Sequence, residues 1–227
     1  GLEKSPGFKI TPGLVNRAMM AVVYGDLLMR VLYRIRPYER IKGSADMLYE
    51  SWAQKCKESL KNGRFSEFKR NIKGIVKDFD RLELRDVKKP RVGLVGEILV
   101  KFHPTANNEI VKIVEREGAE AVMPDLMGFL FYCAYGATFK KRYLSGSFKT
   151  KMLADIAIFI MEFYRKPMKK ALKSSERFEA PPSIYWLARE ASEVLSLGNQ
   201  TGEGWFLTAE MIELIHSGAA NIVCMQP

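Results

Sequence analysis

The sequence is poor in the residues that most often bind metals or form disulfides: its 227 residues include only three cysteines and two histidines. Cys56, Cys133 and Cys224 lie far apart, so there is no C-x-x-C pair of the kind found in metal and redox sites. This scarcity favours a reducing compartment over a disulfide framework. We therefore expect a cytoplasmic protein.

Nucleotide-binding glycine motifs are also missing. No Gly-Lys-Ser/Thr follows a glycine-rich loop, and no G-x-G-x-x-G follows an expected strand. These absences exclude a P-loop and a dinucleotide fingerprint within the chain.

The longest apolar run, residues 14–35, is interrupted by Arg17, Asp26, Arg30 and Arg34. A charge at the centre of a bilayer is costly, so this run indicates a mostly buried helix of a globular protein. We expect no membrane partner.

Positive charge is in excess, since 36 Lys and Arg against 26 Asp and Glu give a formal net charge of +10. Such an excess can favour nucleic acid or an acidic partner. The basic residues recur at helical spacing among apolar residues, which is typical of solvated helix faces, and no nucleic-acid motif accompanies them. We expect no nucleic-acid partner, while docking to an acidic protein stays open.

Residues 1–88 have an all-helical pattern. Thr11 can cap a helix that starts at Pro12, and Pro37 ends it. Two further amphipathic helices are predicted over residues 44–61 and 65–85, separated by the turn signal Asn62-Gly63.

The pattern changes at Pro90. Residues 91–96 predict a buried strand, with Glu97 beginning the loop after it. A helix capped by Asn107 or Asn108 and a short strand over residues 119–123 complete a β-α-β unit. Asp125 can cap the next helix, and the remaining pattern predicts helices over residues 126–144, 148–173, 184–195 and 205–216 and a buried third strand over residues 220–225.

This order predicts an α/β fold: a small parallel sheet with helices on both faces, flavodoxin-like or Rossmann-like but incomplete, preceded by a helical segment. We expect a helical segment over residues 1–88 and an α/β domain over residues 89–227. The chain begins without Met and stops just after an apolar strand, so we expect a middle piece of a longer protein, truncated at its C-terminus. The alternative is a genuine C-terminal strand.

In open parallel sheets, ligands bind beyond the carboxyl ends of the strands. Glu97 follows the first strand there and could act as a general base, or could only accept loop N–H groups. His103, in the next loop, could be catalytic near neutral pH, or could be a solvated loop residue. Gly202, Glu203 and Gly204 open a helix whose free N–H groups could hold an anionic cofactor, or could form only a tight turn.

Cys224 ends the third strand at the same edge. A thiolate there could ligate an iron–sulfur cluster, although such clusters take several Cys ligands. The alternative is a small buried apolar residue. Cys133 lies among aromatic residues of a helix and is predicted to belong to the core.

Three segments of the chain resemble a known family: residues 91–98 (RVGLVGEI) with Asn107-Asn108, residues 198–211 (GNQTGEGWFLTAEM) and residues 221–227 (NIVCMQP). Together they resemble the dehydratase-like reductase region of the large members of the 2-hydroxyacyl-CoA dehydratase activase family, the CoA-substrate-specific enzyme activases. The resemblance covers most of the chain from residue 90 onward, and the helical part more loosely.

The resemblance implies a part of an ATP-driven, low-potential electron-transfer system that serves a 2-hydroxyacyl-CoA dehydratase or a related reductase. It implies a [4Fe–4S] or related cluster near Cys224 in the full-length parent, and an ATPase activase module and a dehydratase or reductase as partners. The family's ATPase phosphate motifs and further Cys residues are absent, so we expect no bound cluster and no independent enzymatic activity here. The alternative is a non-catalytic docking module with a basic surface.

Overall fold

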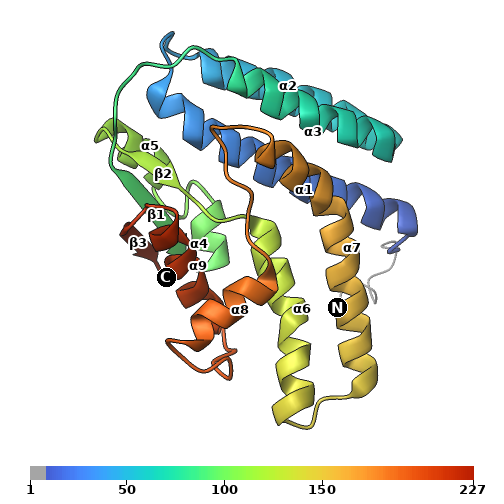
Figure 1. The fold of residues 1–227 in the computed structure, drawn as a ribbon. Helices are drawn as coiled ribbons and strands as arrows, with labels where there is room; N and C mark the ends of the chain where they lie inside the picture. Colours follow the sequence, from blue (N-terminus) through green and yellow to red (C-terminus); the bar gives the residue numbers. More distant parts are fainter. Residues whose placement is uncertain (1–8) are drawn as a thin grey trace.

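The computed structural model describes residues 9–227, which begin with three long helices (Figure 1). α1 spans Pro12–Ile35, α2 spans Ser44–Asn62 and α3 spans Phe65–Asp80. Thr11 Oγ1 accepts the N–H of Leu14 at 3.2 Å, as expected for a cap. A short 3-10 turn, η2 (Arg36–Tyr38), follows α1 because Pro37 has no N–H with which to continue the α-helix.

A small parallel sheet lies in the second part of the chain. β1 (Arg91–Gly96) pairs with β2 (Glu120–Val122) on one side and with β3 (Asn221–Met225) on the other, so the strand order is β2-β1-β3. The helices between the strands are α4 (Ile98–Phe102), α5 (Ile110–Arg116), α6 (Leu126–Tyr143), α7 (Phe148–Lys173), α8 (Ile184–Ser192) and α9 (Gly204–His216).

Helices cover both faces of this sheet. On one face, Leu94 packs in a cluster with Val114 of α5 and Met29 of α1. On the other face, Val95 packs with Leu214 of α9. Leu94 and Val95 point to opposite faces because side chains alternate along a strand. The predicted fold class, a small parallel sheet flanked by helices and preceded by a helical segment, is confirmed.

The largest hydrophobic core lies among the helices. Its buried residues come from α1, α2, α3, α6, α7, α8 and α9, and the largest of them are Phe68, Phe79, Phe131, Trp205 and Phe206. Figure 1 shows α1 beside α2, α3 and α7, and the core joins helices from both sides of residue 88 around it. None of the helices in residues 9–227 has the length and apolar character needed to cross a membrane.

The start of α6 differs from the prediction. Asp125 precedes the helix, but its side chain accepts none of the helix N–H groups. Instead Asp26, on α1, accepts the N–H groups of Leu126 at 2.8 Å and Met127 at 3.0 Å. Asp125 binds the guanidinium of Arg30 at 2.7 Å, and this charge-assisted bond holds its carboxylate away from the helix end.

Three further local predictions were wrong. Glu97 does not begin a loop, because its carboxylate accepts the N–H of Val100 at 2.9 Å and so starts α4. The third strand is not buried: β3 is an edge strand that pairs only with β1, and its Cys224 is exposed. Cys133 is exposed rather than in the core, because α6 is apolar on all sides and buries the neighbouring Phe131 and Tyr132 instead.

Candidate functional site

Glu97, predicted at the end of β1, and Glu203, predicted at the start of the last helix, both lie at the start of α4. Glu97 Oε2 accepts the N–H of Val100 at 2.9 Å, and Glu203 Oε1 accepts the N–H of Ile98 at 3.0 Å. Both side chains therefore satisfy free N–H groups of the first helical turn, where negative charge is favourable. The structure brings these two predicted residues together through the helix end that they cap.

Gly202 and Gly204 shape the turn before α9. Both have positive φ, +63° and +50°. The Tyr132 hydroxyl donates to the carbonyl of Gly202 at 3.0 Å. A Cβ on Gly204 would lie only 2.1 Å from the carbonyl oxygen of Asn199. The turn is thus packed closely on α6, and position 204 requires glycine for this approach.

His103 and Cys224 lie apart from that turn. His103 is exposed where α4 ends, and Cys224 is exposed on β3, where its Sγ accepts from Gln226 Nε2 at 3.8 Å. Cys56 is buried in α2, and Cys133 lies on α6. In residues 9–227 no three His, Cys, Asp or Glu side chains gather in a way that could hold a metal ion. The residues present therefore do not fit an iron–sulfur cluster, which takes several Cys ligands.

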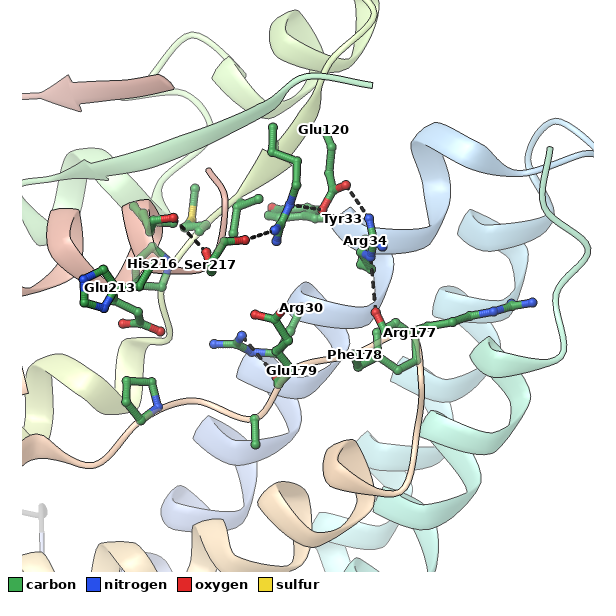
Figure 2. A pocket seen from close by; sticks show the side chains of 18 of the residues that line it. Arg30, Tyr33, Arg34, Glu120, Arg177, Phe178, Glu179, Glu213, His216 and Ser217 are labelled. Carbon is green, nitrogen blue, oxygen red and sulfur yellow. Dashed lines mark hydrogen bonds and ion pairs between the residues drawn. The ribbon is translucent and has the colours of Figure 1, made fainter. Parts of the chain in front are cut away.

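A cavity of about 330 Å³ lies beside β2 and the start of β1 (Figure 2). Its walls come from α1, β2, residues 176–182 and the C-terminal end of α9, and none of the predicted site residues lines it. The volume is within the range of small-molecule sites. The acidic and basic side chains that line it are Arg30, Arg34, Arg91, Glu120, Glu176, Arg177, Glu179 and Glu213.

Glu120 holds one wall of this cavity in place. It is 1 % exposed and accepts hydrogen bonds from the Tyr38 hydroxyl at 2.7 Å, from Arg34 at 2.5 Å and from Arg91 at 3.1 Å. Arg91 also donates to the carbonyl of Ser217. One buried carboxylate thus orients two guanidinium groups, and among the described residues the Nη2 groups of Arg34 and Arg91 have no protein acceptor.

Arg30 lies on the α1 side of the cavity and is held by a second buried carboxylate. Its Nε and Nη2 donate to Asp125 Oδ1 at 3.1 Å and 2.7 Å. On the same helix, burial and the charge of Asp125 raise the pKa of Asp26 to about 8. Because Asp125 and Glu120 are both buried beside arginines, the positive charge of this cavity is largely balanced.

Glu213, on α9, differs from Glu120, which two arginines hold. Burial raises the pKa of Glu213 to about 7, although the charge of Arg30 acts in the opposite direction. No ion pair or side-chain hydrogen bond holds it within residues 9–227. Figure 2 shows Glu213 and His216 on the side of the cavity opposite Arg34 and Arg177. A carboxyl with this pKa can donate a hydrogen bond to a ligand when protonated and accept one when ionised.

Part of this site could have been predicted from the sequence. Asp26, Arg30 and Arg34 recur every four residues, which places them on one stripe of a helix that is otherwise apolar. Arg91 and Glu120 each open a strand, and parallel pairing puts them opposite each other. No sequence pattern pointed to Glu213, because it faces the cavity together with the distant segment of residues 176–182.

The arrangement can bind an oxygen-rich small molecule, since oriented guanidinium groups and a carboxyl that is free of ion pairs converge on one cavity. Comparison of the chain with protein-family models, with curated proteins and with solved structures gives no match.

Proposed function

We propose that this chain is a ligand-binding module that holds a small carboxylate-bearing molecule in the cavity between α1, β2 and α9. The observation that carries the proposal is that Glu120 orients the Arg34 and Arg91 guanidinium groups while each keeps a free Nη2. Arginine presents its donors in a planar fork that matches a carboxylate. Donors that are already oriented lose little conformational entropy on binding.

Glu213 should make this binding depend on pH. When protonated, it can donate a hydrogen bond to a ligand carboxylate, and when ionised, it repels that carboxylate. Because the pKa of Glu213 is about 7, the ligand should bind more tightly below pH 7 than above it.

Calorimetric titration with succinate, a simple dicarboxylate, at about pH 6 and about pH 8 tests the proposal. The protein should bind succinate saturably and more tightly at the lower pH, and Glu213→Gln should remove the difference. Arg91→Gln should weaken binding. The matched control is Arg40→Gln, because Arg40 is exposed and pairs with Glu83 outside the cavity. Equal losses in the two arginine variants, or no saturable binding by folded protein, would overturn the proposal.

A second proposal follows the family resemblance. We propose that the parent protein takes part in ATP-driven electron transfer, in the cytoplasm, to a 2-hydroxyacyl-CoA dehydratase or a related reductase. This chain would dock the ATPase module through its net charge of +10. The exposure of Cys224 on the edge strand β3 favours this function, because another protein surface can reach the thiol there. Further Cys ligands would have to come from outside these residues.

The second proposal is tested by anaerobic reconstitution of a longer protein with iron and sulfide. Stoichiometric iron should be lost in Cys224→Ser and kept in Cys133→Ser, since Cys133 is also exposed but lies on α6. Iron that is indifferent to Cys224 would rule out its role as a ligand.

A further inference from the structure

A second cavity, of about 360 Å³, adjoins the first. Arg34 and Arg177 line both, and Figure 2 shows these two residues together at one side of the first cavity. The second cavity is additionally lined by Arg85, Lys88 and Lys89. Five basic side chains therefore line one concave surface, and no Asp or Glu is among its lining residues.

Few of these cations are neutralised by a carboxylate. Within residues 9–227, only Arg34 forms an ion pair, and its partner Glu120 is shared with Tyr38 and Arg91. Three of the other four cations are held by neutral groups, and Lys88 is exposed. Arg85 donates to the carbonyl of Pro37 at 3.1 Å, Lys89 to that of Gly118 at 3.1 Å, and Arg177 to that of Leu82 at 2.9 Å. These bonds position the side chains and leave their charges uncompensated.

The segment that carries three of the cations is itself fixed. An isolated antiparallel bridge joins Glu39 to Leu84, and the N–H of Arg85 donates to the carbonyl of Tyr38 at 2.8 Å. Leu84 and Arg85 are thereby tied to the turn that follows α1, and the side chain of Lys89 is tied to Gly118. Like charges that are held close together repel one another. An anion that contacts several of them at once relieves this repulsion, so the surface favours the binding of such an anion.

We propose that this second cavity binds the phosphate group of a phosphorylated small molecule. The polar remainder of the ligand lies in the first cavity, so the inference rests on the proposed ligand-binding function and adds the ligand's class. The first cavity is largely balanced in charge and suits a group of low charge. The second has at least four uncompensated cations and suits a phosphate, which carries up to two negative charges and three acceptor oxygens.

The test is calorimetric titration with inorganic pyrophosphate, a probe of the phosphate site alone. Lys88→Gln/Lys89→Gln should weaken pyrophosphate binding by about tenfold or more, which corresponds to roughly 1.4 kcal/mol. The matched control is Lys140→Gln/Lys141→Gln, which removes the same charge from an exposed pair at the end of α6. Lys88→Gln alone should give part of the loss, and this variant leaves the Lys89 contact with Gly118 intact.

The outcomes separate this inference from the proposed function. Pyrophosphate binding that falls only in the cavity variant supports the phosphate site, whether or not succinate binds to the first cavity. Succinate binding without pyrophosphate binding overturns the phosphate site and leaves the first proposal standing. Equal weakening in both double variants also overturns the phosphate site, because binding would then depend only on the net charge of the protein. Tighter binding of a single-stranded oligonucleotide than of pyrophosphate, lost in both double variants, overturns it in favour of a nucleic-acid surface.

Discussion

The carboxylate of Asp26 accepts the backbone N–H of Met127 at 3.0 Å, although 101 residues separate the two in the sequence. With the bond to Leu126, it supplies the cap that α6 does not receive from Asp125. One side chain of α1 therefore fixes where α6 begins.

Replacing Asp26 with Ala should lower the free energy of unfolding by about 2 kcal/mol, the upper end for a helix cap, because two N–H groups lose their acceptor. Urea denaturation measures the change. Ser147→Ala is the control, since Ser147 caps α7 through one exposed bond of 3.2 Å and should cost roughly 0.5–1 kcal/mol. Equal effects of the two changes would contradict a special role for Asp26.

The raised pKa of Asp26 predicts a stability that falls with rising pH. The pKa is about 8 in the folded protein against an ordinary value of 3.8, so between these values the folded state retains a proton that the unfolded state has lost. The stabilisation from this proton is fully present below the ordinary pKa and is lost as the pH rises toward 8. Asp26→Asn should flatten the decline between about pH 5 and pH 8, measured by urea denaturation. Asp86→Asn, at an exposed position, should leave the slope unchanged.

How far the sequence predicts this fold depends on whether a signal is local. The strand at 91–96 and the helix after Thr11 were predicted correctly, because periodicity and caps are set by neighbouring residues. The cap of α6 was predicted wrongly, because Asp26, on a distant helix, accepts the helix N–H groups in place of Asp125. The cavity was missed for the same reason: Arg91 and Glu120 meet through strand pairing, and Glu213 comes near Arg30 only after α9 packs on β1.

A buried ion pair gives a third prediction. Lys101 Nζ and Glu210 Oε1 lie 2.7 Å apart with side chains only 3 % and 1 % exposed. Lys101→Met should cost about 3–5 kcal/mol, because it leaves a buried carboxylate without its partner. The double variant Lys101→Met/Glu210→Leu should recover much of the loss, since no charge remains buried. A double-mutant cycle in urea checks this, and additive losses would show that the pair is not coupled.

The turn before α9 allows two similar glycines to be compared. Both have positive φ, but a Cβ on Gly202 would meet no atom within 4 Å, whereas one on Gly204 would lie 2.1 Å from a carbonyl oxygen. Gly202→Ala should therefore lower the free energy of unfolding by about 1–2 kcal/mol, the cost of the left-handed backbone alone. Gly204→Ala should lower it by more, because Asn199 must also move. Thermal unfolding of the two variants side by side measures the difference.

Two of the three thiols should react with a labelling reagent before the third. Cys133 and Cys224 are exposed, while Cys56 is buried and burial raises the pKa of its thiol to about 12. Since the thiolate is the reactive form, a maleimide should label two sites in the native protein and the third only after unfolding. Mass spectrometry of digested protein identifies the sites. Labelling of Cys56 in native protein at a rate similar to that of Cys224 would mean that α2 opens from the core.

The central place of α1 in the core has a consequence for synthesis. α1 leaves the ribosome before α6 and α7, which help to cover it and are made about a hundred residues later. Until then its apolar face can pack with α2, α3 and the β2 region but not with α6 or α7, and part of that face stays open to other chains. Protection by a chaperone during synthesis of residues 36–125 should therefore raise the yield of native protein.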